Sequence, residues 1–366
     1  HAPDPLAGAP KPHTMIRSLV IATIFIATCA LSTGAEAKKH PKTATHAAYA
    51  NRADAMEFAN DLAARRDLDP AWVRQSIGQA RLLPAVQRLV LPPAKGTAKN
   101  WQAYRARFIE PARVRAGLRF WQEHARTLER AEQEFGVPQE IIVGILGVET
   151  IYGQHMGNFR VIDALATLAF DFPDAHPRAA ERQAFFQREL EQFLSLMQRI
   201  GQDPTAPRGS FAGAMGLPQF MPSSWVRYAI DFDGDGHVSL HASAADAIGS
   251  VASYFIAHGW QPGMPTHFGV RLEGTPTQQD ELLAPDILPT FSAASMQARG
   301  ALLDEAGANH TGPLALVELQ NGTNPPSYVA GTENFYAITR YNWSSYYAMA
   351  VIELGQAVKA AREAAR

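Results

Sequence analysis

Apolar residues recur at every third or fourth position through most of the chain, a spacing typical of helices with one buried face. It predicts helices over residues 138–150, 161–170, 181–200 and 244–258, and a further helix in which Tyr347, Val351, Leu354 and Val358 share one face. Prolines interrupt this spacing between residues 51 and 134, so several short helices are expected there. The predicted fold class is mainly α.

The region between Gly263 and Gly331 departs from that pattern. Pro, Gly and Thr are frequent in it, and short apolar runs such as residues 314–319 are typical of strands. We therefore expect a small β-rich insertion, after which helix resumes.

The start of the chain is predicted to be a leader and a tether. Residues 1–14 precede Met15 and are expected to carry no function, whereas a basic start, an apolar stretch over 18–31 and small residues before Lys38 are typical of a secretory signal. Residues 1–37 are thus interpreted as leader and signal sequence, and 38–50 as a polar tether. The only cysteine, Cys29, lies in this signal and weakly resembles a lipoprotein processing site. Two alternatives follow: the signal is cleaved after Ala37 and the protein is exported in soluble form, or the protein carries a lipid anchor at Cys29.

Composition and charge argue against a nucleic-acid partner and against a membrane-spanning segment after the leader. The chain of 366 residues has a net charge of −2 and scattered basic residues, which offers no electrostatic footprint for nucleic acid. No segment beyond the leader approaches the roughly 20 apolar residues of a membrane-spanning helix. We expect no nucleic-acid partner, and contact with a membrane only through a lipid anchor.

A single acid, Glu149, lies on the apolar face of the helix predicted over residues 138–150. Pro138 suits the first helical position and Gly153 suits the stop. Burial disfavours the charged form of a carboxyl, so Glu149 could keep its proton near neutral pH, as a general acid must. The alternative is a glutamate that swings to the helix edge and pairs with a Lys or Arg.

Residues 209–224 pack glycines, alanines and other small residues around one amide, Gln219. Glycines allow close approach to the backbone, and an amide bordered by Phe220 and Met221 can hydrogen-bond a sugar that stacks on apolar surface. The alternative is a tight turn between packed helices.

Alternating acids at Asp231, Asp233 and Asp235 match the start of an EF-hand calcium loop. Gly236 occupies the sixth place, and His237 could offer its carbonyl at the seventh. The twelfth place is Ala242 instead of the usual glutamate, so Asp246 is the candidate that closes the shell in a longer loop. Asp246 also fits a helix capping box with Ser243, and the two roles are compatible.

Aromatic and amide side chains gather between residues 336 and 347, as in many carbohydrate sites. The alternative is an aromatic core cluster whose hydroxyl groups reach solvent, because its composition would be the same. Other catalytic patterns are missing from the sequence: it has no Gly-Lys-Ser/Thr phosphate loop, no His-Glu-x-x-His helix and no Gly-x-Ser-x-Gly elbow.

Four blocks in one order, namely residues 147–153, 209–224, the Asp231 loop and 335–342, together resemble the membrane-bound lytic murein transglycosylase B family. The resemblance extends from about residue 51 to the C-terminus. It implies a lysozyme-like catalytic core over 136–171, 208–262 and 332–366, an added α region over 51–135 and 172–207, an EF-hand-like calcium loop, and the β-rich insertion over 263–331.

The resemblance also implies an activity. Such enzymes cut the β-1,4 bond between N-acetylmuramic acid and N-acetylglucosamine in peptidoglycan and leave a 1,6-anhydromuramoyl end. Glu149 would act first as general acid and then as general base, without a second acid in a comparable motif. A hydrolytic muramidase and a noncatalytic peptidoglycan-binding protein are the alternatives.

Matching motif positions assign further roles. Ser210 and Gln219 are expected to hydrogen-bond the sugar or the catalytic carboxyl, while Tyr254, Tyr341, Asn342 and Tyr347 line the cleft. Tyr104 is a further substrate-binding candidate, and Arg182 is expected to contact the peptide stems. A structural Ca²⁺ is expected on Asp231, Asp233, Asp235, His237 and Asp246, with no organic cofactor.

The expected partners are peptidoglycan glycan strands and proteins of cell-wall synthesis or remodelling. The expected location is the periplasm after export, with an outer-membrane lipoprotein as the alternative.

Overall fold

The computed structural model describes residues 49–93 and 98–365. The predicted signal, its cysteine and nearly all of the predicted tether lie outside these residues. Within them, no helix combines the length and the apolar character needed to cross a membrane.

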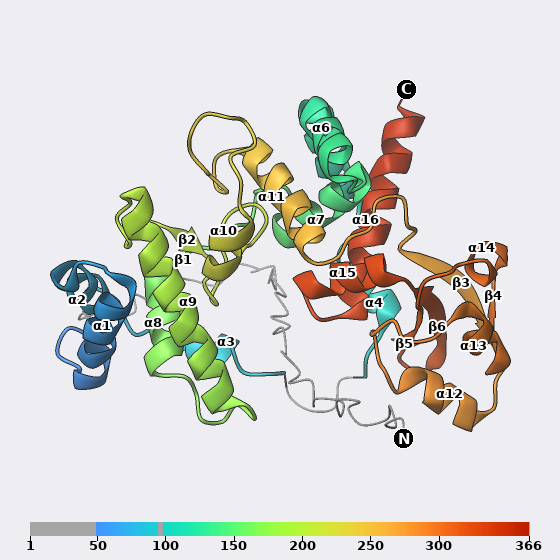
Figure 1. Ribbon diagram of the computed structural model, residues 1–366, viewed down its shortest axis with the longest axis horizontal. Helices are drawn as coiled ribbons and strands as arrows, with labels where there is room; N and C mark the ends of the chain where they lie inside the picture. The colour runs from blue at the N-terminus through green and yellow to red at the C-terminus, as the bar shows by residue number, and fades with distance from the viewer. Residues whose placement is uncertain (1–48, 94–97, 366) are drawn as a thin grey trace, which may run out of the picture.

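The described chain is mainly helical, as predicted (Figure 1). Its first helices are α1 (Ala53–Arg66), α2 (Pro70–Gly78), α3 (Pro84–Leu89), α4 (Trp101–Ala106), α5 (Pro111–Glu123) and α6 (Ala125–Phe135). They are followed by α7 (Gln139–Thr150), α8 (Val161–Phe170), α9 (Ala179–Ile200), α10 (Pro222–Tyr228) and α11 (Ala244–Ala257), and after the sheet by α15 (Glu333–Tyr341) and α16 (Ser345–Ala364).

The first residue of α7 differs from the prediction, whereas its last residue is the predicted one. Pro138 has an extended ψ of 142° and is the residue before the helix instead of its first residue. The helix ends at Thr150, because Ile151 and Tyr152 adopt left-handed backbone with φ of 51° and 58°. The left-handed region is uncommon for any residue other than glycine, and rare for a β-branched one, so the conformation of Ile151 could not be expected from the local sequence, although the helix ends where it was predicted to end.

Helices α7 and α16 form the centre of the fold and pack with their backbones in close contact. A Cβ atom at Gly144 would lie 2.2 Å from the Val351 carbonyl oxygen, and one at Gly355 would lie 2.0 Å from the Glu140 carbonyl oxygen. Only glycine fits at these two positions. Helices α5, α6 and α11 surround the pair.

Helices α8 and α9 pack together beside α1, α2 and α3, on the left of Figure 1. A short antiparallel pair, β1 (Phe159–Arg160) with β2 (Arg208–Gly209), joins the start of α8 to the small-residue block. Helices α4 to α6 instead contact α7, α11 and α16, so the helices of residues 51–135 pack on two different groups of partners. The predicted division into a separate α region and a catalytic core stays a prediction.

Residues 267–331 carry a four-stranded antiparallel sheet, on the right of Figure 1. Its strands are β3 (His267–Leu272), β4 (Ala301–Leu303), β5 (Ala315–Asn321) and β6 (Asn324–Gly331), in the order β4-β3-β6-β5. Helices α12 (Pro276–Leu283), α13 (Ala293–Ala298) and α14 (Glu305–Ala308) accompany them. This unit has a small apolar core of its own, which includes Phe268, Leu282, Met296 and Leu316.

Candidate active site

Glu149 lies in the last turn of α7, and its side chain is partly buried. Its Oε1 atom accepts a hydrogen bond of 2.5 Å from the hydroxyl of Tyr347, on α16. Burial raises the pKa of Glu149 to about 7, although the Tyr347 hydrogen bond acts in the opposite direction. A large share of the protein therefore holds this proton at neutral pH. Among residues 49–93 and 98–365, no Lys or Arg forms the helix-edge ion pair with Glu149 that was considered above.

A row of tyrosine rings extends from Tyr347 along one wall of the site. The ring of Tyr347 lies parallel to that of Tyr341, with centroids 6.4 Å apart, and Tyr341 contacts Tyr254 at 4.7 Å. The hydroxyl of Tyr341 donates to the Pro218 carbonyl at 2.6 Å, and that of Tyr254 donates to the Arg340 carbonyl at 2.8 Å. The negative charge of Glu149 contributes to the raised pKa values of Tyr341 and Tyr347, after burial.

Tyr104, on α4, lies close enough to the same carboxyl to be affected by its charge. Burial and, after it, the charge of Glu149 raise the pKa of Tyr104. Its ring contacts that of Tyr346 at 5.9 Å, next to the tyrosine that bonds Glu149. The structure thus brings Tyr104, Tyr341 and Tyr347 together around Glu149, and Tyr254 packs on Tyr341.

Gln219 and Ser210 hold the small-residue block in shape. Gln219 has a left-handed φ of 51°, and its Nε2 atom donates to the carbonyls of Met156 at 3.1 Å and Gly216 at 2.9 Å. The Ser210 hydroxyl oxygen accepts from the backbone N–H groups of Ala212 and Ala214. The tight turn considered as an alternative is therefore present, and these hydrogen bonds go to backbone groups instead of Glu149.

Asn342 and Arg182 lie in different surroundings. Asn342 is the residue directly after Tyr341 at the end of α15 and is half-buried. Arg182 lies on α9, is only 7% exposed, and packs its guanidinium over Phe186 at 5.4 Å from the ring centroid. Burial and the charge of Arg178 lower the pKa of Arg182 to about 10.

Two residues that the sequence did not single out position this site. The Thr150 hydroxyl donates to the Leu217 carbonyl at 2.8 Å and accepts from the Gly153 N–H at 3.0 Å, which ties the end of α7 to the small-residue block. Glu189, 3% exposed on α9, accepts hydrogen bonds of 2.9 and 2.6 Å from the N–H and hydroxyl of Ser223 at the start of α10. Neither has a local signal, because their partners are 67 and 34 positions away.

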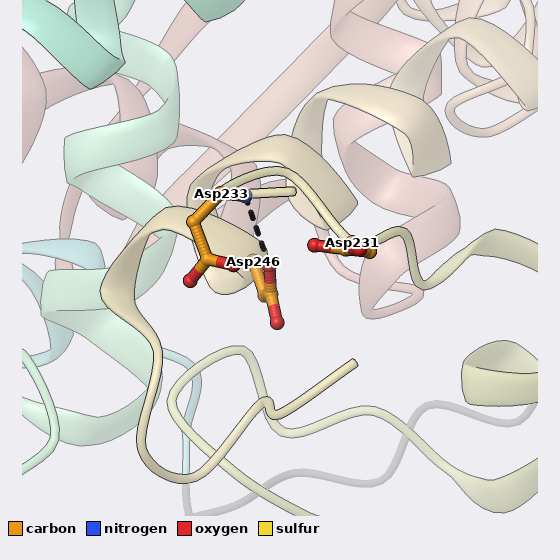
Figure 2. A group of neighbouring side chains, drawn as sticks. All are labelled: Asp231, Asp233 and Asp246. Carbon is orange, nitrogen blue, oxygen red and sulfur yellow. Dashed lines mark hydrogen bonds between the residues drawn. The ribbon is translucent and has the colours of Figure 1, made fainter. Parts of the chain in front are cut away.

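Three acids gather at the loop before α11 (Figure 2). Carboxylate oxygens of Asp231, Asp233 and Asp246 lie within 4.8 Å of one another. Asp246 is 1% exposed and accepts hydrogen bonds from the N–H groups of Phe232 and Ser239, both at 2.7 Å. Asp246 thus turns its carboxylate toward the loop, as the longer-loop hypothesis requires, while Ser243 caps the helix through the Asp246 N–H.

The rest of the loop also suits a hard cation. The N–H groups of Gly236, Gly234 and Asp235 hold the pKa of Asp231 below its usual range, so its carboxylate is charged at neutral pH. Gly236 has a φ of 90°, as the predicted sharp turn demands. Asp235 is not one of the three clustered acids, and its Oδ1 accepts from the His237 N–H at 2.8 Å. Asp231, Asp233 and Asp246 form an oxygen-rich donor set of the kind that calcium prefers.

Known proteins resemble this chain over most of its length. Residues 50–356 match the model of the transglycosylase SLT domain family. The membrane-bound lytic murein transglycosylase B of Escherichia coli (strain K12) is 42% identical over 322 residues, which cover 86% of this chain and 85% of that protein.

Solved structures resemble the fold as well. The soluble lytic transglycosylase SltB1 from Pseudomonas aeruginosa is 40% identical, with a TM-score of 0.76 over 84% of this chain and 99% of its own. The Escherichia coli lytic transglycosylase Slt35, solved in complex with calcium, is 39% identical, with a TM-score of 0.74 over 89% of this chain and 100% of its own. These matches confirm the lysozyme-like fold class and the family resemblance predicted from the sequence.

Proposed function

The chain belongs to the SLT transglycosylase family and is a peptidoglycan lytic transglycosylase, and we propose that Glu149 is its catalytic acid and base. The observation that carries this proposal is the raised pKa of Glu149, about 7, inside a wall of tyrosines. A carboxyl with that pKa is protonated often enough at neutral pH to donate, and basic enough afterwards to accept.

The first step breaks the β-1,4 bond between N-acetylmuramic acid and N-acetylglucosamine. Protonated Glu149 donates its proton to the leaving glycosidic oxygen as the bond to C1 breaks. The carboxylate that remains is stabilised by the hydrogen bond from the Tyr347 hydroxyl. Because this bond favours the charged form, it helps Glu149 to release the proton.

The second step closes the 1,6-anhydro ring. The Glu149 carboxylate takes the proton from the 6-hydroxyl of the same muramoyl residue while that oxygen forms its bond to C1. The proton lost in the first step is thereby replaced, and no water is consumed. Among the described residues, burial and Tyr347 are the causes of the Glu149 pKa, and no second carboxylate contributes to it, unlike in glycosidases that use a pair of acids.

The remaining predicted site residues are assigned to the sugar and its peptide. Tyr104 and Tyr341, which are only partly buried, would offer flat faces to the glycan, as carbohydrate sites commonly do. Tyr347 and Tyr254 are 2% and 6% exposed, so they would line the site mainly by holding Glu149 and packing on Tyr341. Contacts from Ser210, Gln219 and Asn342 to the sugar, and from Arg182 to the peptide stems, are further parts of the proposal.

A structural calcium ion is proposed at the loop before α11. Asp231, Asp233 and Asp246 would hold it, with Asp235 and the His237 carbonyl as further predicted ligands. Support comes from the clustered oxygens and from the calcium complex of the related Slt35. The ion would fix the loop to α11, which also carries Tyr254, and would take no part in the reaction.

The location and the partners are further parts of the proposal. The Escherichia coli relative is named membrane-bound, so an association of this protein with the cell envelope is proposed. Its partners there would be peptidoglycan strands and proteins of cell-wall synthesis or remodelling. Export through the predicted signal, and the choice between lipid anchor and soluble form, can be read from the mass of the mature N-terminus.

Digestion of purified peptidoglycan, followed by mass analysis of the products, tests this function. Muropeptides that end in 1,6-anhydromuramic acid are expected. Products one water heavier would instead identify a muramidase. The Glu149→Gln variant should bind the wall but lose turnover by orders of magnitude, while wild-type protein that binds without releasing any product would identify a binding module.

A further inference from the structure

A pocket lies where the sheet unit meets the helical core. It has a volume of about 390 Å³ and is lined by Lys99, Tyr104, Asp286, Trp343 and Tyr346, among others. A second hollow of about 180 Å³ shares Lys99, Asp286 and Tyr346 with it and continues toward β5. Together they form a groove large enough for more than one small chemical group.

The groove is built from rigidly held parts. The Lys99 carbonyl accepts from the Gly322 N–H at 3.0 Å, so the segment before α4 is fixed to the β5–β6 hairpin. The Tyr346 hydroxyl accepts from the Gln320 N–H at 2.8 Å, which ties the start of α16 to the same hairpin. The walls therefore belong to elements that cannot separate without breaking these bonds.

Opposite charges face this groove without pairing. Lys99 and Asp286 are both exposed, and neither forms an ion pair with another residue in the described part of the chain. The Lys99 ammonium lies 6.0 Å from the centre of the Tyr346 ring. By contrast, the other acid of the groove, Glu318, already accepts from Gln320 and Tyr328. One cation and one anion are thus free to receive a ligand that carries both charges.

The groove adjoins the proposed catalytic centre. Tyr104 lies in its wall and senses the charge of Glu149, and Tyr346 directly precedes the tyrosine that bonds Glu149. A glycan bound at Glu149 could therefore place the substituents of a neighbouring sugar in this groove.

Resting on the proposed function, we propose that the groove binds the stem peptide of a muramoyl residue next to the cleaved bond. Lys99 would receive a free carboxylate of the peptide, and Asp286 the free ammonium of its diamino acid. Trp343 and Tyr104 would offer apolar faces to the sugar or the peptide backbone. Stem peptides are zwitterionic in this way when they are not cross-linked, whereas a strand stripped by an amidase keeps only the lactyl carboxylate next to each muramic acid ring, with no ammonium and no peptide carboxylate.

The test compares two substrates: glycan strands with uncross-linked stem peptides, and the same strands after an amidase has removed the peptides. Lys99→Gln and Asp286→Asn remove each charge with little change of shape, and asparagine tolerates the left-handed backbone of Asp286, which has a φ of 56°. Each variant should lower the ratio of kcat/KM for peptide-bearing over peptide-free strands roughly threefold to tenfold. Arg271→Gln, an exposed cation on β3 outside the groove, is the matched control and should leave the ratio unchanged.

The outcomes separate this inference from the proposed function. If the wild-type protein cleaves neither substrate, the proposed function fails. If it cleaves both and the variants change both rates equally or not at all, the inference fails while the function stands. Thermal melting of each variant checks that its fold is intact. A fall in kcat/KM on the peptide-bearing strands alone is then due to a lost contact with the peptide.

Discussion

Replacing Glu149 with glutamine tests whether burial of this carboxyl costs stability at neutral and alkaline pH. Its pKa is about 7 in the folded protein, against an ordinary value of 4.5. A difference of about 2.5 in pKa corresponds to about 3 kcal/mol of folding free energy. Because the folded state holds the proton more tightly, the contribution is complete below the unfolded pKa and is lost as the pH rises through about 7.

Glutamine has the same shape and no charge, and its oxygen can still accept the Tyr347 hydrogen bond. The variant should therefore match the wild type near pH 4 and be more stable by up to about 3 kcal/mol above about pH 8. Urea unfolding at both pH values measures this difference, and the titration of all other groups cancels between the two proteins.

A matched control lies on the same helix. Glu140 is bonded by Lys359 at 2.9 Å near the surface, so Glu140→Gln should lower stability by at most about 1 kcal/mol at alkaline pH. If Glu149→Gln changes the unfolding free energy equally at both pH values, the carboxyl is not held neutral by burial and the reasoning is refuted.

Three further predictions concern the hydrogen bond to Glu149, the calcium loop and the end of α7. Tyr347→Phe removes the hydrogen bond that favours the charged form of Glu149, so the pKa of Glu149 should rise and the alkaline limb of the kcat/KM profile should move to higher pH. The control Tyr254→Phe loses a hydrogen bond to the Arg340 carbonyl instead, and should leave that limb in place. Calcium should raise the melting temperature of metal-free protein by binding the folded state, and Asp246→Asn should abolish the increase. An equal increase in the variant would contradict the role of Asp246 as a calcium ligand. Thr150→Val removes two hydrogen bonds that orient the end of α7. It should therefore lower the free energy of unfolding in urea by about 1–3 kcal/mol and reduce kcat more than it changes KM. Unaltered kinetics would show that Thr150 does not position Glu149.

The sequence predicted those features that depend on local periodicity. Helix α8 has the predicted bounds, and α7, α9 and α11 differ by one or two residues at an end, as helix termini commonly do. The raised pKa of Glu149 was also predictable, because a single acid on an apolar stripe is placed by the same periodicity that buries its neighbours.

Features that depend on distant contacts were not predictable. The partner of Glu149 is 198 positions away along the chain. The left-handed turn at Ile151 is closed by local bonds to Leu146 and Gly147, but it falls on a β-branched residue that rarely adopts this conformation. The loop acids illustrate the limit in another way. The EF-hand spacing identified Asp231 and Asp233 and made Asp246 the candidate for closing the shell. In the fold these three carboxylates lie together, whereas Asp235, which the same spacing selected, is not one of the clustered acids.

The bond between Tyr347 and Glu149 has a consequence for biosynthesis. Helix α16 supplies both this hydroxyl and the closely packed neighbour of α7, yet it is translated long after the acid it serves. A nascent chain that has emerged only as far as the sheet carries the acid without the partner or the covering helix. The surroundings that raise the pKa of Glu149 are therefore complete only after α16, the last helix of the described chain, has been synthesised.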